Sequence, residues 1–221
     1  MPSPSAIAIL GGSGQQGRGL AQRLAMAGEP IVVGSRDPDR ARATIAGWPS
    51  TGAAIDVADN VSAVTRADIT ILAVPFSTVD ALLADLHPHF KPESLVIDVT
   101  VPVTFAGGRI SMIDVPEGSA AQHIRTLLPA SVRLAATFKT LPAHLLDEVA
   151  RSLDCDEFVC GDSEEARAQA SALVLKLKGV RAVDVGSLSR ARSVEQLTAL
   201  AIAINRRHKI REARFRVVGL P

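Results

Sequence analysis

The sequence has few cysteines, few aromatic residues and no excess of charge of either sign. It contains two cysteines, Cys155 and Cys160, no tyrosine and one tryptophan, and its net charge is +1. The cysteines lack C-x-x-C spacing and nearby histidines, which argues against a metal site of the zinc type. The low aromatic content argues against a platform for stacking nucleic-acid bases. We therefore expect no bound metal and no nucleic-acid partner.

Long apolar runs and a targeting pattern are also missing. The apolar stretch at 197–204 is too short to span a bilayer. The chain does not open with a basic segment followed by an apolar run, which is the pattern of a secretory signal. Hydrophobic residues make up 47% of the chain, so a packed core is expected. We expect a cytoplasmic protein that does not contact a membrane.

Short apolar runs rich in β-branched residues alternate with segments of helical periodicity. Strands are expected at 6–10, 31–34, 69–74, 95–99, 132–136, 157–160 and 181–185, with a possible extended segment at 215–218. Helices are expected at 17–27, 38–46, 78–86, 163–177 and 187–207, and from about residue 141. This alternation predicts an α/β fold with a parallel sheet and right-handed crossovers.

A glycine-rich turn follows the first predicted strand and opens the first predicted helix. Its residues are Gly12, Ser13, Gly14, Gln15, Gln16 and Gly17, which match G-x-G-x-x-G. The first glycine allows a tight turn, the second lets a pyrophosphate approach the backbone, and the third lets helix and strand pack closely. Amides at the helix N-terminus then hold the anion. The turn predicts a dinucleotide site in a Rossmann-type, doubly wound parallel sheet.

The residues after the second predicted strand distinguish NADP from NAD. An NAD site places an acidic residue there to bind the ribose 2′-hydroxyl. This chain instead has Ser35 and Arg36, with Arg40 one helical turn further on. Guanidinium groups bind a 2′-phosphate that a carboxylate would repel, whereas Asp37 and Asp39 suit a helix cap and first turn. We expect NADP(H), the alternative for the two arginines being a solvated face.

The motifs resemble those of the NADPH:coenzyme F420 oxidoreductase family, whose members move a hydride between NADP(H) and the deazaflavin coenzyme F420. The resembling blocks lie at 8–14, 17–21, 33–36, 101–103, 140–143, 159–162 and 186–189. The last two blocks are more specific than the glycine-rich turn, which many dehydrogenases share. The resemblance covers nearly the whole chain and implies F420 as the second substrate.

The resemblance also implies which residues bind the two substrates. Ser13, Ser35, Arg36 and Arg40 would hold the adenosine phosphate half of NADP(H). The nicotinamide and the deazaflavin would be framed by Val74, Pro75, Val101, Pro102, Leu141, Pro142 and Ala143. Two of these loops, at 74–75 and 101–102, follow predicted strand ends, where open α/β sheets bind ligands.

The chain departs from the family pattern at two places. Lys139 stands where a histidine or asparagine is expected, and Arg214, after Ala213, stands where a glycine is expected. Lys139 is a candidate catalytic residue that would polarise the acceptor electrostatically, the alternative being a lysine that reaches solvent from a strand end. Ala213 and Arg214 would contact the second substrate, and the long Arg214 side chain could narrow its pocket.

A basic run, Arg206 to Arg211, follows the long C-terminal helical pattern. It could retain the phosphate and oligoglutamate tail that coenzyme F420 carries, or simply complement the dipole at a helix C-terminus. The helix itself, at 187–203, is apolar on more than one face. It is therefore either central core or a dimer contact, and the resemblance favours a homodimer.

The sequence thus predicts an NADP-dependent oxidoreductase acting on coenzyme F420. Residues 1–140 would form the NADP-binding Rossmann domain. Residues 141–221 would form a small C-terminal α/β lobe that completes the second-substrate pocket. Two alternatives stay open: an NADPH-dependent reductase of a small carbonyl or imine, and a non-catalytic NADPH-binding sensor or partner module.

Overall fold

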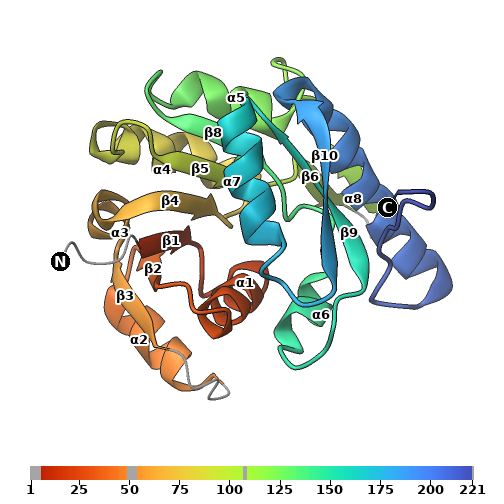
Figure 1. Ribbon diagram of the computed structural model, residues 1–221, viewed down its shortest axis with the longest axis horizontal. Helices are drawn as coiled ribbons and strands as arrows, with labels where there is room; N and C mark the ends of the chain where they lie inside the picture. The colour runs from red at the N-terminus through yellow and green to blue at the C-terminus, as the bar shows by residue number, and fades with distance from the viewer. Residues whose placement is uncertain (1–5, 49–53, 107–108, 221) are drawn as a thin grey trace.

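The computed structural model describes residues 6–48, 54–106 and 109–220 (Figure 1). Within them, eight strands form one sheet in the order β10-β9-β8-β5-β4-β1-β2-β3. The strands are β1 (Ala6–Leu10), β2 (Ile31–Ser35), β3 (Ile55–Asp59), β4 (Ala67–Leu72), β5 (Leu95–Asp98), β8 (Arg133–Ala136), β9 (Cys155–Gly161) and β10 (Val180–Ser187). A separate antiparallel hairpin consists of β6 (Val103–Ala106) and β7 (Arg109–Met112).

The α-helices lie between strands along the chain, except for α8, which follows the last strand. They are α1 (Gln15–Met26), α2 (Pro38–Ala46), α3 (Asn60–Arg66), α4 (Val79–Leu86), α5 (Ala120–Leu127), α6 (Ala143–Asp147), α7 (Glu164–Val174) and α8 (Ala191–His208). The expected Rossmann-type fold is confirmed. The expected helix caps are confirmed as well: the Asp37 side chain accepts a hydrogen bond from the Arg40 amide at 3.0 Å, and the Ser163 side chain accepts one from the Ala166 amide at 3.1 Å. Sequence reasoning did not predict β3, α3, α5 or the β6–β7 hairpin.

Two hydrophobic layers cover the two faces of the sheet because neighbouring strand residues point to opposite sides. On one face, Ile7 and Ile9 of β1 pack with Leu20 and Leu24 of α1, together with residues of α6 and α7. On the other, Leu10 packs with residues of α3, α4 and α5. In Figure 1, α7 crosses in front of the sheet and α8 runs along its right-hand side.

The strands β9 and β10 run opposite to the rest of the sheet. β9 pairs antiparallel with β8, while β10 pairs parallel with β9. The sheet is therefore mostly parallel, and the segment predicted as a C-terminal lobe contributes strands to it. The domain boundary at residue 140 stays a prediction. Residues 215–218 form no strand; the Phe215 carbonyl accepts from the Asp156 amide at 2.9 Å, so this part of the tail lies beside β9.

Helices α1 and α6 pack closely against each other. A Cβ placed on Gly19 would come within 2.5 Å of Cβ of Leu146, so no larger residue fits between the helices. Arg18 forms an ion pair with Asp147, whose Oδ1 lies 2.9 Å from Nε of Arg18. Arg23 donates to the carbonyls of Leu146, Leu145, Glu148 and Arg151. These contacts fix the start of α1 relative to the segment that carries residues 141–143.

Candidate functional site

The glycine-rich turn lies at the carboxyl end of β1. Gly11 has φ +77°, and a Cβ at this position would come within 2.4 Å of the Ala73 carbonyl oxygen. A Cβ on Gly17 would come within 2.5 Å of the Gly11 carbonyl oxygen, so the helix packs directly on the turn. A Cβ on Gly14, by contrast, would meet no atom closer than 3.3 Å, and Ser13, Gly14 and Gln15 are exposed. The tight turn thus rests on Gly11, one residue before the predicted position, and open backbone at Gly14 fits a bound phosphate.

Ser35 is the last residue of β2, and Arg36 and Arg40 follow it. The Ser35 hydroxyl donates to the Asp37 carbonyl at 3.0 Å and accepts from the Asp37 amide at 3.1 Å. Arg36 and Arg40 are exposed, and among the described residues neither side chain forms an ion pair. The neighbouring Arg42, in contrast, is bound to Asp39 at 2.7 Å. Two unpaired guanidinium groups are therefore available at the end of β2.

A cleft of about 470 Å³ lies beside the glycine-rich turn, past the ends of β4, β5 and β8. Gln16 belongs both to the turn and to the cleft lining, and its amide donates to the Phe138 carbonyl at 2.8 Å. The expected residues that line the cleft are Gln16, Val74, Pro75, Val101, Lys139, Leu141, Pro142, Ala143 and Ala213. The cleft also takes in Arg211, from the basic run singled out in the sequence, and residues that sequence reasoning did not select: Phe76, Thr100, Phe105, Thr198 and Asn205.

Some expected residues lie outside this cleft. Pro102 lines a small neighbouring hollow of about 30 Å³, and Arg214 lines an open hollow further out. Arg214 is 3.4 Å from Glu212. The cleft lining includes Ala213 and Arg211 but not Arg214, and the expected contact of Arg214 with the second substrate stays a prediction.

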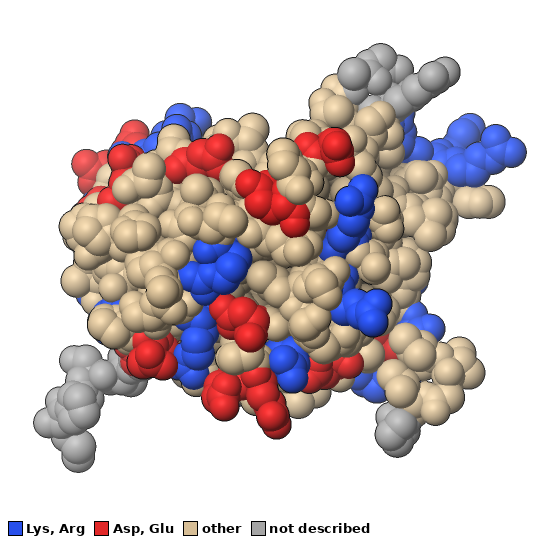
Figure 2. Space-filling view, turned by 90° about the horizontal axis from the view of Figure 1, so that it is seen from above, with Lys and Arg blue, Asp and Glu red and all other residues tan. Residues whose placement is uncertain are grey.

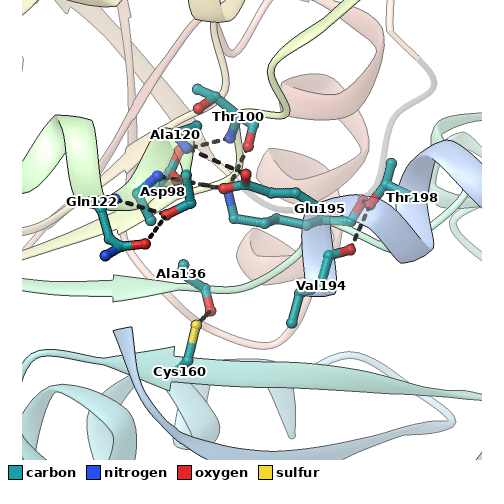
Figure 3. A network of polar contacts seen from close by, with 12 residues as sticks. Asp98, Thr100, Ala120, Gln122, Ala136, Cys160, Val194, Glu195 and Thr198 are labelled. Atoms are coloured by element: carbon teal, nitrogen blue, oxygen red, sulfur yellow. Dashed lines mark hydrogen bonds and ion pairs between the residues drawn. The ribbon is translucent and has the colours of Figure 1, made fainter. Parts of the chain in front are cut away.

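Lys139 lies at the centre of a buried polar network. Its ammonium is 2.6 Å from Asp98 Oδ2 and 3.4 Å from Glu195 Oε1, and it donates to the Thr100 carbonyl. Figure 3 shows Asp98, Thr100 and Glu195 converging on one point from different elements. The Lys139 side chain has no exposed surface. The interpretation of a lysine that reaches solvent is therefore wrong, because two carboxylates hold the ammonium inside the protein.

The charges in this network depend on one another. Burial lowers the pKa of Lys139, but the negative charges of Asp98 and Glu195 outweigh it and raise that pKa overall. Burial raises the pKa of Glu195, against the opposing effect of the Lys139 ammonium. The Glu195 carboxylate also accepts from the amides of Ala120 and Ala121, at 3.2 and 3.4 Å, at the N-terminus of α5. The network thus connects β5, α5 and α8 to Lys139, in the loop that follows β8.

A second buried carboxylate, Glu157, supports the loop that lines the cleft. Because β9 runs antiparallel to β8, Glu157 lies beyond the last residue of β8 and next to the loop at 139–143. Its Oε1 accepts from the Lys139 amide at 2.9 Å, and its Oε2 accepts from the Thr140 hydroxyl at 2.6 Å. Burial raises the pKa of Glu157 to about 7, although these hydrogen bonds favour the charged form. The Phe138 backbone turns here with φ +57°.

The raised pKa of Glu157 predicts a pH-dependent contribution to stability. Its pKa is about 7 in the folded protein and 4.5 ordinarily, so the folded state binds a proton that the unfolded chain has lost. Relative to Glu157→Gln, the wild-type free energy of unfolding is therefore expected to fall by up to about 3 kcal/mol as pH rises from about 4.5 to about 7. Denaturant titrations at several pH values measure this difference.

A matched control for this prediction is Glu165→Gln. Glu165 is exposed in the first turn of α7. Its variant is expected to follow the wild-type pH dependence closely. Identical pH dependence of wild type and Glu157→Gln would show that Glu157 does not titrate in this range.

Both thiols are poor nucleophiles. Cys155 and Cys160 are free and buried, and burial raises the pKa of each to about 12. Cys160 Sγ lies 3.8 Å from the Ala136 carbonyl (Figure 3). Within the ranges that the structure describes, no group of three or more His, Cys, Asp or Glu side chains could hold a metal ion. In the same ranges, no helix is long and apolar enough to cross a bilayer.

Another hollow, of about 570 Å³, lies at the opposite edge of the sheet. Its lining includes Ile69, Ser94 and Arg133, near the starts of β4, β5 and β8. Glu29 and Lys176 in this lining form an ion pair of 2.8 Å with each other. Because ligands of open α/β sheets bind at the carboxyl ends of the strands, the cleft beside the glycine-rich turn is the candidate active site.

Comparison with known proteins identifies the family. Residues 6–102 match the family model described as "NADP oxidoreductase coenzyme F420-dependent". The chain is 38% identical over 224 residues to the F420-dependent NADP reductase of Methanothermobacter thermautotrophicus, covering 97% of this chain and 95% of the relative. The chain belongs to the F420-dependent NADP reductase family.

Two further comparisons agree with membership of the F420-dependent NADP reductase family. The F420-dependent NADP reductase of Methanocaldococcus jannaschii is 32% identical, over 97% of this chain and 98% of its own length. A crystal structure from Arthrobacter sp. FB24, described as a putative F420-dependent NADP-reductase, has a TM-score of 0.81. It covers 97% of this chain and 99% of its own, at 24% identity. That likeness establishes the shared fold.

Proposed function

We propose that this chain transfers a hydride between NADP(H) and coenzyme F420. The observation that carries the proposal is the position of Gln16, which belongs to the dinucleotide-binding turn and also lines the cleft past β4, β5 and β8. A dinucleotide whose pyrophosphate lies on the turn can therefore extend its nicotinamide into the cleft. There the F420 ring would be its neighbour.

The chain would bind NADP(H) at three places. Ser13, Gly14 and Gln15, exposed in the turn, would hold the pyrophosphate through backbone amides of the α1 N-terminus. Ser35, Arg36 and Arg40 would bind the 2′-phosphate. Val74, Pro75, Val101, Leu141, Pro142 and Ala143 would form the apolar walls around the two rings.

The protein's main contribution to catalysis is alignment. The two substrates supply the redox chemistry: the nicotinamide C4 gives a hydride to the deazaflavin C5, and a proton completes the reduction. The walls of the cleft hold the two carbons close together, which removes much of the entropic cost of the reaction. The Thr100 hydroxyl is buried in this lining and has no hydrogen-bond partner among the described residues, which leaves it free to bond a polar edge of either ring.

The deciding experiment mixes purified protein with NADPH and F420 and follows the visible absorbance of the deazaflavin. Loss of that absorbance with matching oxidation of NADPH supports the proposal. Unchanged absorbance, with tight NADPH binding retained, would instead favour the carbonyl or imine reductase or the NADPH sensor. Arg214 and Lys139 are the two residues that favour the carbonyl or imine reductase, and they give it less support here, because Arg214 lies outside the cleft lining and Lys139 is bound by Asp98 and Glu195.

We also propose that the protein is a homodimer that assembles through α8. Its two free thiols suit a cytoplasmic location, which we propose as well. Leu200 of α8 is 50% exposed, while Val194 and Ala201 on the same helix are buried. Phe105, on the neighbouring hairpin, is 66% exposed. An exposed apolar surface of this kind favours a protein contact over solvent.

The dimer prediction concerns Leu200→Glu. A carboxylate in an apolar contact would remain desolvated without a partner, so the variant is expected to be monomeric where the wild type is dimeric. Sedimentation velocity at several concentrations measures the change. Gln169→Glu, at an exposed position of α7 away from this face of α8, is the matched control. A monomeric wild type, or a Leu200→Glu variant that still dimerises, would contradict the proposal.

A further inference from the structure

The chain after α8 forms a cationic wall beside the cleft. α8 ends at His208, and Lys209 turns the backbone with φ +55°. Residues 209–214 then line an open hollow of about 700 Å³, together with His144. Lys209, Arg211 and Arg214 therefore surround one hollow from a single short segment.

The positive charges of this hollow are only partly neutralised. Among its lining residues, Glu212 is the one carboxylate, and both of its oxygens lie 2.6 Å from nitrogens of Arg151. Lys209 and Arg211 are exposed, and within the described part of the chain neither forms an ion pair. In Figure 2, the right-hand end of the visible face carries more Lys and Arg than Asp and Glu.

The hollow opens directly from the cleft. Arg211 and Ala213 line both spaces. The Ala213 amide donates to Asn205 Oδ1 of α8 at 2.8 Å, and the Glu212 pair with Arg151 holds the adjoining residue. The segment is thus fixed in place, so a molecule in the cleft can extend past Arg211 into a preformed basic surface.

We propose that this hollow binds the anionic side chain of the second substrate, with Lys209 and Arg211 contacting its phosphate and carboxylate groups. The inference rests on the proposed function, since F420 is the substrate that would bring those groups. The phosphates of NADP(H) have their own sites at the glycine-rich turn and after β2. The helix dipole gives a weaker explanation for these two cations, because Arg206, Arg207 and His208 already occupy the last turn of α8.

The test compares two acceptors: F420 itself, and the same deazaflavin ring system without its phosphate and glutamates. In the variant Lys209→Gln/Arg211→Gln, the KM for F420 is expected to rise about tenfold at low salt, because two exposed cations no longer attract the anion. The KM for the shortened acceptor and the KM for NADPH are expected to rise clearly less than the KM for F420, even though Arg211 also lines the cleft, because neither molecule places an anionic tail in the hollow. Arg207→Gln, an exposed position in the last helical turn, is the matched control and should leave all three constants nearly unchanged.

Each other outcome has a definite meaning. An unchanged KM for F420, or an equal rise for both acceptors, would overturn the anion site. An equal effect of Arg207→Gln would also overturn it, because it would indicate a general effect of surface charge. If wild-type protein reduced neither acceptor, the proposed function itself would fail, and the failure would be distinguishable from loss of the anion site.

Discussion

Replacing Arg36 and Arg40 with glutamine is expected to raise the KM for NADPH about a hundredfold and to leave the KM for NADH nearly unchanged. Both arginines are exposed after β2, and among the described residues no carboxylate neutralises them. Charge-assisted hydrogen bonds to a phosphate are worth about 1.5 to 3 kcal/mol each, and about 1.4 kcal/mol corresponds to a tenfold change. The 2′-phosphate is what NADPH has and NADH lacks, so the loss should be confined to NADPH.

The control for this prediction is Arg42→Gln on the same helix. Arg42 is held by Asp39 at 2.7 Å, and the exposed pair is expected to contribute little. Steady-state kinetics with both nucleotides give the required constants. A similar rise for NADPH and NADH in the double variant would mean that the arginines hold α2 in place and do not recognise the 2′-phosphate.

The Lys139→Met variant is expected to lose about 3 to 5 kcal/mol of stability, because it leaves two buried carboxylates without their counter-charge. The ammonium is 2.6 Å from Asp98 and 3.4 Å from Glu195, and all three side chains are buried. For a chain of this size such a loss lowers Tm by about 10 °C. Thermal unfolding followed by circular dichroism measures it.

Two further variants separate the structural role of Lys139 from a catalytic one. Lys176→Met removes a partly exposed lysine paired with Glu29 and should cost less than about 1 kcal/mol of stability.

Adding Asp98→Asn and Glu195→Gln to Lys139→Met removes the uncompensated charges and should restore most of the Tm. If kcat returns with stability in this triple variant, Lys139 is structural. If kcat stays low although the triple variant is as stable as wild type, the electrostatic role of Lys139 is supported. An unchanged Tm in Lys139→Met would contradict the network.

The parts of the site that sequence alone could predict are those coded by neighbouring residues. The turn at 11–17 begins directly after β1, and the Ser35-Arg36 pair stands at the end of β2. One short stretch of sequence therefore indicates both the strand and the residues that would bind the ligand. The missed strand β3 is a short edge strand with Asp56 and Asp59 in it, and an apolar pattern does not reveal it. The Asp59 cap on Ser62, at 2.9 Å, is the local signal that could have identified α3.

The network around Lys139 could not be predicted in this way. Asp98 and Glu195 are 41 and 56 residues away from Lys139, and burial of the lysine depends on both. Glu157 was expected in a strand, but its role depends on that strand running antiparallel to β8, and the local sequence of β9 carries no information about direction. The same applies to Arg211, whose place in the cleft follows from the turn at Lys209.

The close packing of α1 against α6 bears on how the two substrates would affect each other. The glycine-rich turn leads into α1, and α1 is held against α6 by the Gly19 contact and by the Arg18 and Arg23 side chains. α6 begins at Ala143, the last residue of the cleft wall that starts at Leu141. A displacement of α1 by a bound pyrophosphate would therefore also move this wall of the cleft. Any change that a dinucleotide then made in the affinity for an acceptor in the cleft would, by thermodynamic reciprocity, equal the change that the acceptor made in the affinity for the dinucleotide.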